Sequence, residues 1–115
     1  MNLEELHSFC KSLKGAEETF PFDETTLVMK VGGKMFALIP LESENTSISL
    51  KCDPEKALAL REQFSNIFPG YHLSKKHWNT IIIDESITQK MIRDMIMDSY
   101  YLVIAGLPKK AREQF

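Results

Sequence analysis

The first apolar pattern of the chain is helical. Apolar residues recur at spacings of three and four and predict a helix over residues 3–14. Asn2 in front of it and Glu5 three residues later form the pattern of a capping box. The following Phe20-Pro21-Phe22 cannot continue a helix, because proline confines the residue before it to extended geometry. We expect these two phenylalanines to fold back onto the core.

Two β-rich runs, residues 25–31 and 34–41, flank the pair Gly32-Gly33. Both central positions of a tight hairpin turn need positive φ, which glycine adopts readily, so the pattern predicts a two-residue β-hairpin. In that register Val31 lies opposite Lys34. We expect the core face to consist of Leu27, Met29, Phe36 and Leu38. The other, more mixed face would carry Thr26, Val28, Lys30, Met35 and Ala37, and is a candidate for contact with solvent or a partner.

The middle of the chain predicts a strand, a helix and a long connection. Residues 47–52 alternate polar and apolar, the period of a half-buried strand whose apolar residues, ending with Cys52, point inward. Asp53-Pro54 then supplies the N-cap and first position of a helix that runs to about residue 64. Residues 66–76 contain several residues that break helices and strands, and we expect them to form a long connection.

The last third predicts a strand followed by the longest helix. Residues 79–84 are rich in isoleucine and predict a strand. Thr88 is the expected N-cap of a helix that ends near residue 105, in front of Gly106. Residues 109–115 are expected to add one further helical turn.

The order of these elements predicts the fold class. Hairpin connections and polar-alternating strands favour a mainly antiparallel sheet with helices packed on one face, an α+β fold in two layers. No linker or repeat divides the sequence, so we expect one domain over residues 1–115. The uncovered sheet face would display Lys30, Ser49, Lys51 and Thr80.

Composition and charge narrow the class of function. The chain has 115 residues, of which 43% are hydrophobic and 26% charged, and a net charge of −2, so that nucleic-acid affinity would need a local basic patch. Cys10 and Cys52 lie beside apolar residues and no secretion-signal pattern is present, so we expect reduced, buried thiols in a cytoplasmic protein. No apolar run reaches the roughly 20 residues that cross a bilayer, and we expect no membrane embedding.

The sequence contains no recognisable catalytic, metal or cofactor motif. His72 and His77 would need further zinc ligands, which neither a Cys-x-x-Cys nor a His-Glu-x-x-His pattern supplies. Cys52 points toward the predicted core, and Gly32-Gly33 joins two strands instead of preceding a helix, so we expect neither a thiol nucleophile nor a phosphate-binding loop. We therefore expect a protein that is not an enzyme and that binds no metal or cofactor.

One short stretch collects basic and aromatic residues without helical periodicity. It contains Tyr71, His72, Lys75, Lys76, His77, Trp78 and Asn79. Lysines can neutralise phosphates and flat rings can stack on exposed bases, which makes this stretch a candidate nucleic-acid surface that Lys30, Lys34 and Lys51 would extend. The alternative is a structural loop, in which Trp78 packs beneath its neighbours and the lysines face water.

Several segments of the chain resemble the MmcQ/YjbR family, small bacterial domains often labelled DNA-binding. These segments are Phe20–Phe22, Lys30–Ala37, Leu50–Pro54, Pro69–His72, Lys75–Thr80 and Ser99–Val103. Together they extend over nearly the whole chain. The resemblance implies a two-layer α+β fold of the kind called CyaY-like or secretion-chaperone-like, in agreement with the pattern above. Through the family's label it also implies DNA binding.

Two functions fit these observations. The first is non-enzymatic binding of DNA through the basic and aromatic stretch. The second is a protein-interaction or chaperone-like module, monomeric or homodimeric, that uses the mixed sheet face and its methionines, since methionine adapts to varied apolar partners. A ligand pocket with His72 and His77, in an enzyme or small-molecule carrier, is a third hypothesis. Convergence of the five lysines in the fold would favour nucleic acid, and dispersal would favour protein.

Overall fold

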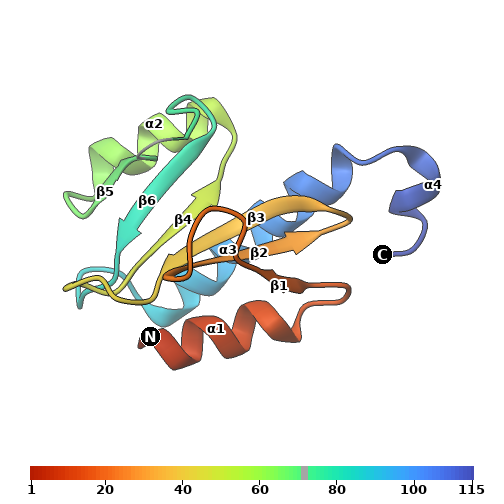
Figure 1. The fold of residues 1–115 in the computed structure, drawn as a ribbon. Coiled ribbons are helices and arrows are strands. Elements are labelled where there is room, and N and C mark those ends of the chain that lie inside the picture. Colours follow the sequence, from red (N-terminus) through yellow and green to blue (C-terminus); the bar gives the residue numbers. More distant parts are fainter. Residues whose placement is uncertain (71–72) are drawn as a thin grey trace.

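The computed structural model describes residues 1–70 and 73–115 and shows one antiparallel sheet with helices packed against it (Figure 1). The six strands lie in the order β1-β2-β3-β4-β6-β5. They are β1 (Glu17–Thr19), β2 (Thr26–Val31), β3 (Lys34–Pro40), β4 (Ser47–Lys51), β5 (Ile67–Pro69) and β6 (Trp78–Ile82). The helices are α1 (Leu3–Ser12), α2 (Pro54–Gln63), α3 (Gln89–Ala105) and α4 (Lys109–Arg112). The predicted α+β fold is confirmed.

The helices begin where the sequence predicts. The Asn2 side chain accepts the Glu5 N–H at 2.8 Å and the Glu5 carboxylate accepts the Asn2 N–H at 3.2 Å, which completes the capping box of α1. Asp53 and Thr88 cap α2 and α3 in the same way, each accepting a backbone N–H three residues later. Local side-chain chemistry therefore determines where α1, α2 and α3 begin.

The two edge strands were not predicted. β1 and β5 have three residues each, too few to show an alternation of apolar and polar residues. Each forms by pairing with a longer neighbour: Glu18 lies opposite Met29, and Phe68 lies opposite Thr80. The predicted long connection over residues 66–76 is therefore wrong in its first part, which belongs to the sheet.

The β2–β3 hairpin has the predicted turn, but its register shifts farther from the turn. Both turn glycines have positive φ, and Val31 lies opposite Lys34 as predicted. Between Met29 and Lys30 the register shifts by one residue, so that Met29 pairs with Ala37 instead of Phe36. This β-bulge reverses the faces of the remaining residues of β3.

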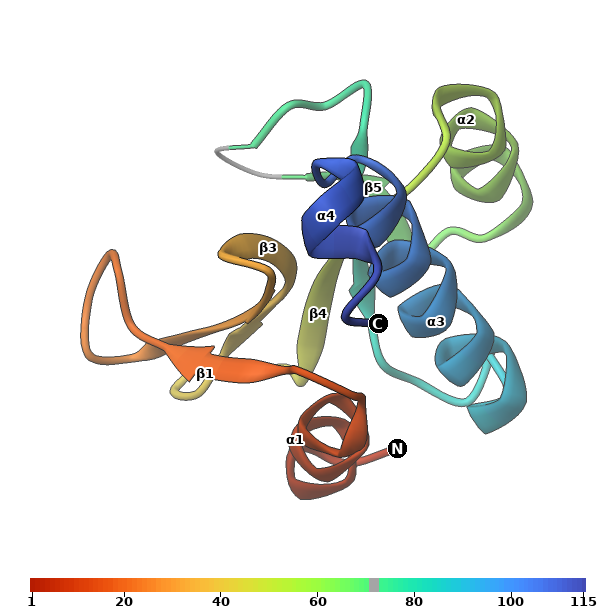
Figure 2. The same cartoon turned by 90° about the vertical axis from the view of Figure 1, so that its right-hand side faces the viewer.

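Because of the bulge, the predicted core face of β3 is partly wrong. Ala37 and Ile39 join the main core, whereas Leu38, predicted on the core side, lies on the opposite face of the sheet. The main core lies between the sheet and helices α1 and α3, and includes Leu6, Phe36, Ile48, Ile81, Ile92 and Ile96. The opposite face, away from the helices, is called the open face below (Figure 2).

A buried hydroxyl bridges β3 and β4 next to the bulge. These strands pair at only two positions, Ala37 with Leu50 and Leu38 with Ser49. Beyond them, the fully buried Ser99 of α3 donates its hydroxyl to the Phe36 carbonyl at 2.6 Å and accepts the Lys51 N–H at 2.9 Å. Ser99 thus replaces one step of the ladder and attaches α3 to both halves of the sheet.

The prediction that Phe20 and Phe22 fold back onto the core is wrong. Their side chains are 48% and 62% exposed, because the loop that carries them runs along the open face. Asp23 orders this loop by accepting the backbone N–H groups of Thr25 and Thr26 at 2.9 and 2.7 Å. Within residues 1–70 and 73–115, no helix is both long enough and apolar enough to cross a membrane.

We expect Ser99→Ala to lower the free energy of unfolding by about 2 kcal/mol, because it leaves a buried N–H and a buried carbonyl without partners. Urea denaturation monitored by circular dichroism measures the change. The control is Ser8→Ala on the exposed side of α1, which should change stability by less than about 0.5 kcal/mol. Equal stability of both variants would contradict the bridging role of Ser99.

Candidate functional site

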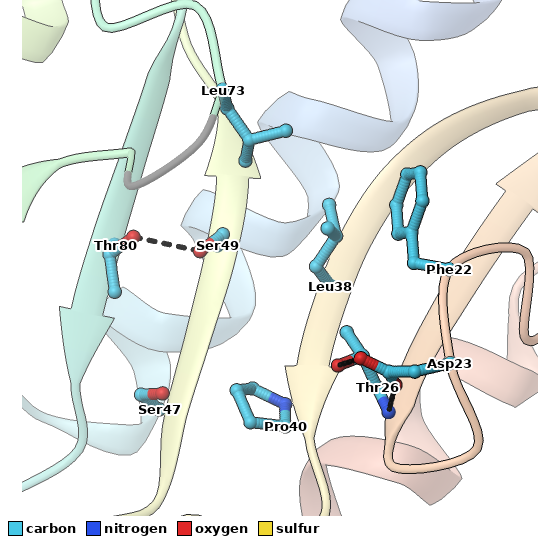
Figure 3. Close-up of a pocket in the computed structure, with 9 residues that line it drawn as sticks. All are labelled: Phe22, Asp23, Thr26, Leu38, Pro40, Ser47, Ser49, Leu73 and Thr80. Carbon is cyan, nitrogen blue, oxygen red and sulfur yellow. Dashed lines mark hydrogen bonds between the residues drawn. The ribbon is translucent and has the colours of Figure 1, made fainter.

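The open face contains a groove with a volume of about 450 Å³ (Figure 3). Its lining comes from four strands and from the two loops that project from the open face. The lining residues are Phe22, Asp23, Thr26, Leu38, Pro40, Ser47, Ser49, Leu73 and Thr80. The lining therefore combines apolar side chains with small hydroxyl residues, and Asp23 is the one charged group among these nine residues.

The groove exists because β3 and β4 pair over so short a distance. Pro40, at the end of β3, has no N–H to donate to a neighbouring strand. The residues on the β4 and β6 side are short, and Ser49 and Thr80 satisfy each other through a hydroxyl bond of 2.8 Å. Phe22 and Leu73 stand on opposite sides of this floor in Figure 3 and form the walls.

Asp23 is ionised and held in place at one end of the groove. The Thr25 backbone N–H, and then the Thr26 hydroxyl, lower the pKa of its carboxyl group by bonding to the charged form. A negative charge therefore remains beside the groove at neutral pH. The sequence contained the signal for this loop, since an aspartate followed by two threonines commonly forms such a turn.

Trp78 and Asn79, predicted as part of a nucleic-acid surface, are buried. Trp78 is 8% exposed and packs with Val28 and Leu38 on the open face, with Leu73 against them. Asn79 is 2% exposed and faces α2. For these two residues the alternative of a structural role is the correct one, because neither ring nor amide is accessible to a base. Tyr71 and His72 lie outside the described residues.

The predicted lysines only partly converge. Lys30 and Lys51 both lie on the open face near the same end of the sheet, separated by β3 and thus by roughly 10 Å. Lys75, Lys76 and His77 are exposed in the loop that enters β6 at this end. Lys34 is different: it pairs with Val31, whose side chain is in the main core, so Lys34 emerges on the helix side.

Arg61 holds the basic loop in place and was not identified from the sequence. Its guanidinium donates from Nε to the Asn79 side-chain oxygen at 2.6 Å, and from Nη2 to the carbonyls of Trp78, at 3.2 Å, and of Lys75. The Asn79 amide in turn donates to the Ala57 carbonyl of α2 at 3.3 Å. Nothing in the local pattern around Arg61 indicates these contacts, because its partners lie 14 to 18 residues away.

Both thiols are buried, and burial governs their protonation. Burial raises the pKa of the Cys10 thiol to about 12, and burial also raises that of Cys52. Both cysteines are free and buried, and at neutral pH they are protonated and unreactive. In the part of the chain that the structure describes, no group of three or more His, Cys, Asp or Glu side chains could hold a metal ion.

Comparisons with known proteins place the chain in a family. The family model described as YjbR matches residues 11–102. The chain belongs to the YjbR family. It is 36% identical to YbdF of Escherichia coli O157:H7, over 99% of this chain and 97% of that protein, and 33% identical to YjbR of E. coli K12, over 98% and 96%. Both relatives are described as uncharacterised.

Solved structures of similar proteins share the fold of this YjbR-family chain. The Deinococcus radiodurans protein DR2400, with a DUF419 domain, superposes with a TM-score of 0.92 at 39% identity, over 98% of this chain and 86% of that one. A Pseudomonas syringae protein superposes with a TM-score of 0.77 at 26% identity, over 90% and 99%. These comparisons show family and fold, and leave the ligand of the open face to be inferred from its chemistry.

We expect Asn79→Ala to lower the free energy of unfolding by about 1.5 to 3 kcal/mol, because it removes a buried acceptor from the Arg61 guanidinium. Hydrogen exchange should also become faster in residues 73–77, whose backbone Arg61 anchors. Asn45→Ala, in the exposed β3–β4 turn, is the matched control. If both variants exchange and unfold alike, Asn79 does not anchor the loop.

Proposed function

We propose that this YjbR-family protein is a non-enzymatic, cytoplasmic binding module that captures an apolar segment of another protein in the open-face groove. The observation that carries this proposal is the groove itself: about 450 Å³, walled by Phe22 and Leu73, with a floor of small hydroxyl residues, two of which, Ser49 and Thr80, bond to each other. Two free, buried thiols fit a reducing compartment.

The chemistry of the groove suits an apolar ligand. Phe22 is 62% exposed, and Phe68, which lies opposite Thr80 and so on the same face, is 45% exposed. A segment that covers these rings gains roughly 25 cal/mol for each Å² of apolar surface removed from water. The Ser49 and Thr80 hydroxyls bond to each other and the Thr26 hydroxyl bonds to Asp23, which lowers the desolvation cost of covering them with an apolar segment.

The groove suits a nucleic acid less well. Among the described residues that line it, Asp23 alone is charged and repels phosphate, and Trp78 is too deeply buried to stack on a base. The net charge of −2 adds no long-range attraction for a polyanion. For these reasons the protein-interaction hypothesis takes precedence over the DNA hypothesis that the sequence favoured.

Nucleic-acid binding is the second candidate, because of one observation. Lys75 and Lys76 are exposed in the loop before β6, at the same end of the open face as Lys30 and Lys51. Four lysines at one end could neutralise a few phosphates of a strand that passes over this end and avoids the groove. Stacking would then have to come from residues other than Trp78.

We expect Ser49→Tyr to abolish capture of apolar peptides while the fold remains intact. Tyrosine suits a strand position, and its ring would occupy the floor of the groove. Short random peptides are selected on the immobilised wild-type protein, and the enriched sequences are made synthetically and titrated by fluorescence anisotropy. Ser8→Tyr on α1 is the control. If no apolar sequence is enriched, or if Ser49→Tyr binds equally well, groove binding is ruled out.

The second candidate makes a separate prediction for short single-stranded and duplex DNA. If the lysine end binds DNA, the logarithm of the association constant falls with the logarithm of salt concentration by roughly 0.7 to 0.9 per phosphate neutralised. Lys75→Ala with Lys76→Ala should then reduce that slope by about two phosphates, while Lys109→Ala with Lys110→Ala on α4 should not. If neither DNA binds at low salt concentration, nucleic acid is excluded as a ligand.

A further inference from the structure

The charges around the groove are separated along the strand direction. Three connections are acidic at the end where β2 and β4 begin and β3 and β6 finish. Residues 20–25, 41–46 and 83–88 contain no lysine, arginine or histidine. Their acidic residues are Asp23, Glu24, Glu42, Glu44, Asp84 and Glu85. We call this the acidic end of the groove.

The opposite end is basic. On the open face, β4 presents Ser47, Ser49 and then Lys51. β2 likewise presents Thr26, Val28 and then Lys30, so the last residue that β2 and β4 each present on the open face is a lysine. Residues 73–77 add Lys75 and Lys76, and contain no acidic residue.

Two carboxylates lie near the basic end but do not neutralise its positive charge. Glu17, on the neighbouring strand β1, lies opposite Lys30 and so on the same face of the sheet. Asp53 lies two residues after the end of β4 but caps α2, where its side chain accepts the Lys56 N–H. On the open face itself, the lysines at residues 30, 51, 75 and 76 outnumber Glu17.

We propose that the segment bound by the groove is bipolar: apolar in its centre, with acidic residues at the end that meets Lys30 and Lys51 and basic residues at the end that meets Asp23, Glu42 and Glu44. This inference rests on the proposed function and adds the charge pattern of the partner. A helical segment would lie with its carboxyl end toward the lysines, because its macrodipole is negative there.

The physical reason is electrostatic complementarity across a surface that is apolar in the middle. The charged ends of the groove are exposed, so each pair contributes little alone, but several act together and disfavour partners whose two ends carry the same charge. The apolar centre of the groove would provide the affinity, and its charged ends would provide selectivity among apolar segments. A uniformly acidic polymer such as nucleic acid would meet repulsion at the acidic end.

Four synthetic peptides test this inference with the full-length protein. They share one core of alternating leucine and serine and differ only in their end residues: lysines at one end and glutamates at the other, glutamates at both ends, lysines at both ends, or serines at both ends. We expect the bipolar peptide to bind about tenfold more tightly than either peptide with like-charged ends. Raising the salt concentration should reduce this difference, since the Debye length falls from about 10 Å at 0.1 M to about 3 Å at 1 M.

A charge-reversed protein separates local polarity from net charge. In Lys30→Glu with Lys51→Glu three carboxylates, Glu17 included, oppose Lys75 and Lys76, so the basic end loses its excess of positive charge. The preference should then move toward the peptide with lysines at both ends. Lys109→Glu with Lys110→Glu on α4 carries the same change in net charge away from the groove and should keep the preference for the bipolar peptide. A shift of preference in both variants would mean that net charge alone decides, and would overturn the inference.

The remaining outcomes distinguish the two proposals. If the peptide with serine ends binds the wild-type protein and fails to bind Ser49→Tyr, but charged ends make no difference, then groove binding stands and the bipolar partner is overturned. If none of the four peptides binds at any salt concentration, the bipolar inference and the groove-binding function fail together.

Discussion

The open face depends on one constraint, the short contact between β3 and β4. The two strands pair at only two positions, and the bulge at Phe36 and the proline at residue 40 stop the pairing on either side. A longer ladder would draw the strands together and leave no space between their outer side chains. The groove is thus a consequence of backbone hydrogen bonds that β3 and β4 do not make with each other.

Helix α3 stabilises this interrupted sheet. Ser99 joins the Phe36 carbonyl to the Lys51 N–H, and its neighbour Tyr100 packs edge-on against the Phe36 ring with centroids 5.4 Å apart. The Tyr100 hydroxyl also donates to the Lys14 carbonyl beyond α1. Two adjacent residues of α3 therefore hold the bulge in β3, the end of β4 and the segment after α1, on the side of the sheet opposite the groove.

The stretch from Lys75 to Asn79 has a structural part and an accessible part. Asn79 and Trp78 are both buried, on opposite faces of β6, and Arg61 bonds to the Asn79 side-chain oxygen and to the Trp78 carbonyl. This network fixes the backbone of the loop, and in doing so it holds Lys75 and Lys76 outward at the basic end of the groove. Residues that look like one functional motif in the sequence thus divide into anchors and exposed charges.

The sequence by itself determined the local structure: the three helix starts, the glycine hairpin turn, the alternating strand β4 and, through their order, the α+β class. These features depend on residues within about four positions of each other, and their chemistry is visible in the chain. Tertiary structure alone decided the edge strands, the bulge at Phe36 and the burial of Trp78 and Asn79. Each of these depends on partners far away in the sequence, such as Ser99 for the bulge and Arg61 for the loop. Tertiary structure also decides the groove. Its walls, Phe22 and Leu73, lie across the floor from each other only when the two halves of the sheet are assembled on α3.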